Sequence, residues 1–183
     1  MMSEFLRFKN STETSVDMYI TGDILDDSWK GWSWGENENT YPSNVRELLK
    51  ECKGKNLNVY INSGGGDVFA SVAISNMLAR HDGKTKAIVD GLAASGASII
   101  AFGCDEIEIP ENAFLMIHKP NTVASGDANN FRSVAETLDT IQEGITNTYL
   151  KKTIEGVEKE KITEMIDAET WLTGKEARDY FTV

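Results

Sequence analysis

The chain has 183 residues, of which 40% are hydrophobic and 26% charged, as expected for one soluble domain with a sizeable core. Its formal net charge of −11 disfavours binding to nucleic acid or to an anionic membrane, because the phosphates would repel it. The longest weakly polar run, residues 91–104, is too short to span a bilayer, and residues 1–12 contain no apolar stretch typical of a secretory signal.

A short strand and a polar, tryptophan-rich segment open the chain. Residues 17–21 (VDMYI) alternate and are rich in β-formers, which predicts a strand. The polar segment that follows contains Trp29, Trp32 and Trp34. The simpler expectation is a surface loop that tucks these rings onto the core, and the alternative is a segment that contacts a partner or substrate.

Helical and strand patterns then alternate up to residue 117. The predicted helices cover residues 44–52, 68–81 and 94–102, and Ser43 can cap the first. The predicted strands cover residues 57–61, 86–89, 106–109 and 113–117. This alternation is typical of βαβ units and predicts an α/β domain with a largely parallel sheet.

The last third of the chain is predicted to be mainly helical. Residues 131–152 form a long helical pattern with apolar residues on one side, and residues 159–166 form a second. No strand directly follows the long helix, so we expect it to project, and an exposed apolar stripe on it would favour oligomerisation. Thr173 and Glu176 form a capping-box pattern for a last short helix.

The chain contains two cysteines, Cys52 and Cys104. They do not have the spacing of metal ligands, and isolated thiols suit a reducing compartment, where they behave as small apolar residues. We therefore expect a cytoplasmic protein.

The two histidines have different surroundings. His81 follows a helical pattern in a polar context, ARHDGK, and is expected to be solvated and favourably placed at the end of the helix dipole. His118 directly follows the apolar run AFLMI and precedes a loop. A strand end beside a loop is a common place for a catalytic residue, although a structural histidine also fits.

Ser95 is the candidate partner of a catalytic histidine. It lies at a predicted strand-to-helix junction among very small residues, GLAASGAS. Small neighbours allow close approach of a substrate backbone, and a helix N-terminus favours a developing oxyanion. The alternative is a small-residue helix packed tightly on the sheet. Ser98, one turn further on, should face the core.

Gly64, Gly65 and Gly66 follow a predicted strand but match neither a P-loop nor a dinucleotide-binding pattern. Such a loop can present backbone N–H groups to an anion, which would make half of an oxyanion hole. Asp167 and Glu169 are candidates for the acid that orients a catalytic histidine. Both would point the same way in an extended stretch, or both are simply solvated.

The sequence contains four notable segments, which follow one another in the order INSGGGD, GLAASGAS, MIHKP and DAETWLTGKEA. This order resembles the proteolytic subunit of the Clp protease, a serine peptidase family with a crotonase-like fold. The resemblance covers residues 17–181 and implies a single α/β domain built as a spiral of repeated βαβ units. Gly64 stands where the family usually has proline.

The resemblance also implies roles for individual residues. Ser95 falls on the family's nucleophile and His118 on its general base, while Gly65, Gly66 and Gly96 fall on the oxyanion donors. The register places Glu169 where the family has aspartate, and Asp167 is held as a second candidate. No metal or organic cofactor is implied.

The amino-acid sequences of these segments are especially similar to those of the Clp-like proteases encoded in phage and prophage head-gene clusters. Those proteases are taken to trim scaffold or capsid protein. This likeness implies a homo-oligomeric ring, often heptameric and stacked in pairs. Residues 128–152 would form a handle between rings, with residues 16–127 and 153–183 as the head. Whether an ATPase feeds the ring is left open.

Two alternatives keep the fold but change the function. One is a Clp-like assembly protein with a degenerate triad, favoured by glutamate in place of aspartate. The other is a crotonase-like enzyme that acts on acyl-CoA thioesters, although such enzymes typically rely on carboxylates rather than on serine and histidine.

Overall fold

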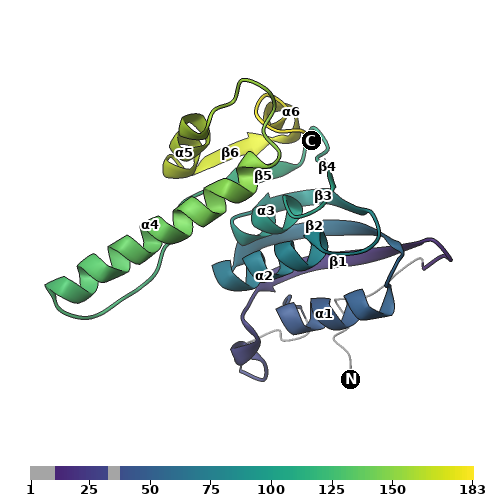
Figure 1. The fold of residues 1–183 in the computed structure, drawn as a ribbon, viewed down its shortest axis with the longest axis horizontal. Coiled ribbons are helices and arrows are strands. Elements are labelled where there is room, and N and C mark those ends of the chain that lie inside the picture. Colours follow the sequence, from purple (N-terminus) through teal and green to yellow (C-terminus); the bar gives the residue numbers. More distant parts are fainter. Residues whose placement is uncertain (1–10, 33–37) are drawn as a thin grey trace.

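A computed structural model describes residues 11–32 and 38–183 of the chain. Their strands form one six-stranded sheet, in which β1, β2, β3, β5 and β6 are neighbours in that order and β4 pairs with β3 (Figure 1). The strands are β1 (Ser15–Ile24), β2 (Asn56–Gly66), β3 (Thr85–Ala94), β4 (Glu106–Glu108), β5 (Phe114–Ile117) and β6 (Thr170–Thr173). All pairs are parallel except β5 with β6, which confirms the predicted α/β class with a largely parallel sheet.

The strand β3 is long enough to pair with two later strands. Its first half, at Lys86–Ile88, is aligned with β4, and its second half, at Leu92–Ala94, is aligned with β5. Because β3 and β5 run parallel, their carboxyl ends meet at the same edge of the sheet. The residues that directly follow these two strands are therefore brought together.

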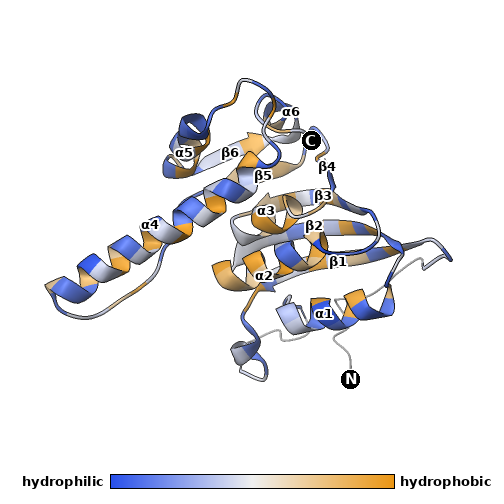
Figure 2. Cartoon of the chain, in the orientation of Figure 1, coloured by the Kyte–Doolittle hydropathy of each residue, from blue (hydrophilic) through white to orange (hydrophobic). Residues whose placement is uncertain are grey.

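Helices connect the strands and cover the sheet. They are α1 (Pro42–Glu51), α2 (Val68–Ala79), α3 (Gly96–Ala101), α4 (Ala128–Leu150), α5 (Lys159–Asp167) and α6 (Gly174–Ala177), with a 3₁₀ turn, η1 (Asp27–Trp29). Residues of β1 and β2 largely alternate between buried and more exposed positions, so one face of these strands packs on the core. Figure 2 shows hydrophobic residues concentrated on these strands, α2 and α3.

The helices α2 and α3 lie close together because small residues meet between them. A Cβ atom on Gly96 would collide with Ser71, and one on Gly103 would collide with Ser75. Ser71 and Ser75 are four residues apart, so they share one face of α2. This close contact fixes the position of α3, and with it the residue that precedes α3.

The long helix α4 projects from the body of the molecule (Figure 1). Only its C-terminal part is buried, at Ile145, Thr146 and Tyr149. The helix begins three residues before the predicted start, because Asp127 and Asn130 form a capping box. Among the described residues, none of the helices has the length and hydropathy needed to cross a membrane.

Several boundaries differ from the sequence predictions. The strand β2 continues from the predicted end at residue 61 to Gly66, and β3 from residue 89 to Ala94, because both extensions remain paired with neighbouring strands. The helix α3 consequently begins at Gly96. The short strand β6 was not predicted. The capping box of Thr173 and Glu176 is confirmed.

Three predictions about single side chains are wrong. Ser43 does not cap the first helix, because α1 begins one residue earlier, at Pro42, and its N-cap residue is Tyr41. His81 is not solvated: its side chain is 3% exposed, and Nε2 lies 2.7 Å from the carbonyl oxygen of Lys55, because the ring turns inward towards the loop before β2. Trp29 and Trp32 are 56% and 83% exposed, so neither ring is tucked onto the core. Trp34 lies outside the described residues, as do residues 1–10.

Cys52 and Cys104 are free, buried thiols, as expected for small apolar residues. Burial raises the pKa of Cys52 to about 11 and that of Cys104 to about 12. Both thiols therefore stay protonated near neutral pH, which suits a packing role rather than a reactive one.

Candidate active site

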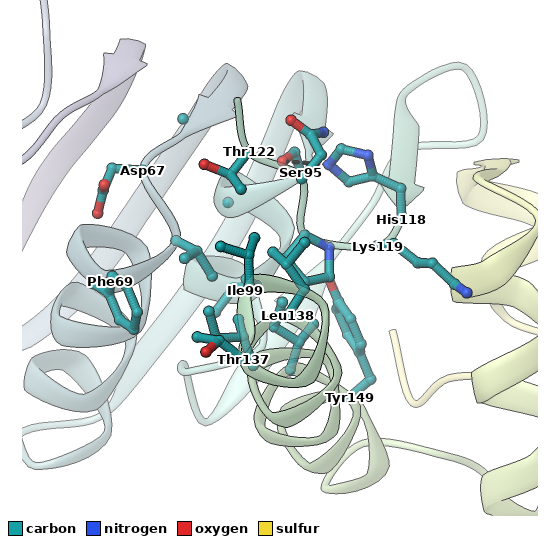
Figure 3. A pocket seen from close by; sticks show the side chains of 18 of the residues that line it. Asp67, Phe69, Ser95, Ile99, His118, Lys119, Thr122, Thr137, Leu138 and Tyr149 are labelled. Atoms are coloured by element: carbon teal, nitrogen blue, oxygen red, sulfur yellow. Dashed lines mark hydrogen bonds between the residues drawn. The ribbon is translucent and has the colours of Figure 1, made fainter. Parts of the chain in front are cut away.

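The site is assembled from the ends of β3 and β5. Ser95 directly follows β3, and His118 directly follows β5. The N–H group of Ser95 donates to the carbonyl oxygen of Met116 at 3.0 Å, which ties the two strand ends together. The Nε2 atom of His118 lies 2.8 Å from Ser95 Oγ, and Figure 3 shows the two side chains facing one another.

The backbone turns sharply at Ser95. This residue has φ 52° and ψ −123°, in a region that non-glycine residues adopt only when the surrounding structure holds them there. Its carbonyl oxygen accepts hydrogen bonds from the N–H of Ser98 at 3.0 Å and from Ser98 Oγ at 2.6 Å. The turn therefore ends β3, starts α3 and presents Oγ at the junction.

The three predicted glycines lie around this turn. A Cβ atom on Gly65, which has φ 97°, would come within 2.7 Å of Ser95 Cβ and of the Gly96 nitrogen. A Cβ atom on Gly96 would lie 3.3 Å from the Gly66 nitrogen. The N–H of Gly96 lies in the first turn of α3, where no intrahelical acceptor exists, whereas the N–H of Gly65 donates to Ser63 Oγ at 3.0 Å.

The two candidate acids have different surroundings. Glu169 Oε2 lies 3.9 Å from His118 Nδ1, and the glutamate side chain is 61% exposed. This distance is an ionic contact but too long for a hydrogen bond. Asp167 contacts Lys119 Nζ at 3.0 Å and accepts a hydrogen bond from Gln142 Nε2 at 2.8 Å.

The expectation that both acids point the same way from an extended stretch is therefore wrong. The helix α5 ends at Asp167, and Glu169 has φ 51°, so the backbone between them is a helix end followed by a left-handed residue rather than an extended stretch. The hydrogen bond from Lys119, and to a smaller extent the one from Gln142, lowers the pKa of Asp167. The Asp167 carboxylate therefore stays charged, and its contacts are with these two residues. Glu169 alone of the two faces His118.

A cavity of about 600 Å³ adjoins Ser95 and His118. One wall comes from α4, which contributes Val134, Leu138, Ile141, Ile145 and Tyr149. Figure 3 shows Leu138 and Tyr149 on this helix, below Ser95 and His118. The sequence pattern predicted the apolar stripe on this helix, and we expected the stripe to favour oligomerisation if it were exposed. Most of the stripe instead lines the cavity, and Phe131 at its start is 52% exposed.

No group of histidine, cysteine, aspartate and glutamate side chains suited to hold a metal ion occurs in the described parts of the chain. The cavity is lined mainly by apolar side chains, with the serine and the histidine among its polar groups. This arrangement of a serine hydroxyl, an imidazole nitrogen and the backbone N–H of Gly96 at the start of α3 is able to carry out acyl transfer.

The family model described as Clp protease matches residues 38–182, most of the chain. The chain belongs to the Clp protease family. Its relatives include proteins named ATP-dependent Clp protease proteolytic subunit from Oltmannsiellopsis viridis, 31% identical over 136 residues, and Chlorella vulgaris, 29% identical over 136 residues. A protein of that name from Bacteroides fragilis is 26% identical over 144 residues.

These matches cover 73–78% of this chain and 66–69% of the three relatives. They support the Clp protease part of the resemblance. Members of this family are serine peptidases, and the residues that follow β3 and β5 lie inside the matched region.

Gly65→Ala should disturb the turn at Ser95, because the new Cβ would collide with Ser95 and Gly96 and because φ 97° is unfavourable for alanine. We expect the free energy of unfolding, measured by urea denaturation, to fall by about 1–3 kcal/mol. Gly64→Ala is the matched control, since a Cβ there meets nothing within 4 Å. Equal stability of the two variants would contradict this reading of the turn.

Proposed function

We propose that this member of the Clp protease family is a serine endopeptidase in which Ser95 is the nucleophile and His118 the general base. The observation that carries the proposal is the 2.8 Å contact between Ser95 Oγ and His118 Nε2. A base at this distance can take the hydroxyl proton as the oxygen attacks a peptide carbonyl.

The contacts of the imidazole define the proton transfers. His118 Nε2 must be unprotonated to accept the proton of Ser95, so Nδ1 carries the hydrogen and faces Glu169. Once Nε2 is protonated, the Glu169 carboxylate stabilises the imidazolium. The imidazolium then gives the proton to the leaving amine, and water hydrolyses the acyl-enzyme by the same route.

Backbone N–H groups stabilise the oxyanion in this proposal. The N–H of Gly96 lies at the start of α3, next to the nucleophile. Gly65 and Gly66 are the candidates for the second donor, and Gly65 has to release its hydrogen bond to Ser63 Oγ in order to serve. Loss of one such donor typically costs about 100-fold or more in rate.

The cavity suggests which peptide bonds are cleaved. Its wall on α4 includes four aliphatic side chains, and its lining elsewhere includes Ile99 and Val68. Burial of a large apolar side chain there contributes about 1.5–3 kcal/mol of binding free energy. We therefore propose cleavage next to large apolar residues of a protein or peptide substrate.

We further propose that the chain forms a homo-oligomeric ring, heptameric or a stacked double ring, that acts as a head-maturation protease in the cytoplasm of a phage host. The projecting helix α4 and its exposed Phe131 are suited to contacts between subunits. Its substrates would be scaffold or capsid proteins, and an ATPase partner is not required by the proposal. Native mass spectrometry of the full chain should give a multiple of seven subunits, and a monomer would contradict the ring.

Ser95→Ala should abolish labelling by a fluorophosphonate probe, because the only atom proposed to attack the probe is Ser95 Oγ. Ser133→Ala is the matched control, since Ser133 also lines the cavity but lies on α4, and it should label as the wild type does. Unchanged labelling of Ser95→Ala would exclude this nucleophile.

Other results with the wild type would favour the alternatives. Rings without any labelling would indicate a catalytically degenerate assembly protein. Hydrolysis or hydration of a crotonyl-CoA thioester without peptide cleavage would indicate a crotonase-like acyl-CoA enzyme.

Glu169→Gln should lower kcat for an apolar peptide substrate by about 10–100-fold, because the neutral amide stabilises the imidazolium less well than the carboxylate does. Asp167→Asn should change kcat less than about threefold, because Asp167 contacts Lys119 and Gln142 rather than the histidine. Steady-state kinetics of both variants decide between the acids, and a larger loss in Asp167→Asn would reverse the assignment.

A further inference from the structure

Two buried hydroxyl groups behind the nucleophile have no part in the function proposed above. Ser98, one turn after Ser95, is 0% exposed, and Tyr149, near the end of α4, is 1% exposed. The Oγ atom of Ser98 lies 2.6 Å from the Tyr149 hydroxyl oxygen. This hydrogen bond therefore joins α4 to α3 at Ser98, in the first turn of α3 after Ser95.

The direction of this hydrogen bond follows from the proton count. Ser98 Oγ has one hydrogen, which it donates to the carbonyl oxygen of Ser95 at 2.6 Å. The Tyr149 hydroxyl must therefore be the donor to Ser98 Oγ. Burial raises the pKa of Tyr149 well above its ordinary value, so the phenol keeps this proton. The result is a chain of donors from Tyr149 through Ser98 to the backbone of Ser95.

Packing fixes the direction of the phenol. The Tyr149 ring meets Phe102 edge to face, with 5.0 Å between ring centroids, and lies 6.4 Å from the Phe181 ring. Phe102 and Phe181 also pack edge to face at 4.9 Å. A ring held by two aromatic neighbours presents its hydroxyl in one place, and the same ring lines the cavity beside Ser95.

The carbonyl that receives this chain belongs to the residue with the unfavourable backbone. Ser95 has φ 52°, and its own side chain makes no cap hydrogen bond to α3. A conformation of this kind persists only when neighbouring groups hold it. Because the peptide plane between Ser95 and Gly96 carries both this carbonyl and the Gly96 N–H, holding the oxygen also holds the proposed oxyanion donor.

We propose that Ser98 and Tyr149 are positioning residues for the reaction: their hydrogen-bond chain holds the carbonyl of Ser95 and so keeps Oγ and the Gly96 N–H in the reacting geometry. The inference rests on the proposed function, since it assigns roles around the same nucleophile. Neither residue touches the substrate carbonyl, and both act through Ser95.

Tyr149→Phe tests the chain with the smallest change, because it removes the donor and keeps the packed ring. The labelling rate is measured as a function of fluorophosphonate concentration, which gives a maximal rate and a half-saturation concentration. The fraction of protein labelled at completion gives the fraction of correctly folded sites. We expect the maximal labelling rate to fall about 5–10-fold, the size expected for one lost hydrogen bond. The half-saturation concentration should change less than twofold.

Ser98→Ala and the double variant complete a double-mutant cycle. Ser98→Ala should lower the maximal rate about tenfold or more, and the double variant should be no slower than Ser98→Ala, because Tyr149 acts through Ser98. Ser98→Ala carries the test alone if Tyr149→Phe does not fold. Thr146→Val is the matched control: it removes a buried hydroxyl from the same helix, one that donates only within α4, and should label at the wild-type rate.

The outcomes separate this inference from the proposed function. If the wild type is not labelled at Ser95, the proposed function fails. If the wild type is labelled and both Tyr149→Phe and Ser98→Ala label at its maximal rate, the positioning role is wrong, even when their melting temperatures fall. Additive losses in the double variant would also overturn the chain, because they would mean that the two hydroxyls act separately.

Discussion

The backbone turn at Ser95 is the constraint on which the rest of the site depends. It is held from three sides: by the carbonyl of Met116 in β5, by Gly65 in the β2 extension, and by Ser98 at the start of α3. Each neighbour comes from a different element of the fold. The serine and the imidazole consequently meet without any long flexible side chain, because both follow the ends of adjacent parallel strands.

The candidate acid, Glu169, is held differently from Ser95 and His118. Glu169 lies between α5 and β6, and β6 is the antiparallel strand at the edge of the sheet. Its side chain is mostly exposed and remains 3.9 Å from the ring nitrogen. Nearby, Lys119 follows His118 and forms an ion pair with Asp167, which links the end of α5 to the residues that follow β5.

The sequence predicted the parts of the structure that depend on local patterns. The spacing of apolar residues located every strand except β6 and most helices, and the capping residues Thr173 and Glu176 located α6. The predicted end of β2 was too early, because Asn62 and the following glycines are typical of a loop, although neighbouring strands pair with this segment. This pairing joins residues that are far apart in the sequence, so local patterns do not reveal it. The exposure of Trp32 and the burial of His81 likewise depend on the surrounding fold and could not be predicted from neighbouring residues.

The site was predicted unevenly. The serine, the histidine and the three glycines were found from motif order, and the structure brings them together. The different surroundings of Asp167 and Glu169 depend on a single positive φ at Glu169, for which an acidic side chain gives no signal. The bond between Ser98 and Tyr149 joins residues 51 positions apart, so only the packing of α4 against α3 reveals it.

The helix α4 has one apolar side that continues beyond the cavity. Leu138 and Tyr149 on this side line the cavity, and Phe131, nearer the start of the helix, is 52% exposed. Successive residues on a helix are about 100° apart, so Phe131 lies almost two full turns before Leu138 and on nearly the same side. The exposed apolar surface and the cavity wall are therefore parts of one stripe. A contact that turns the exposed end of α4 about its axis would also change the shape of the space proposed to hold a substrate side chain.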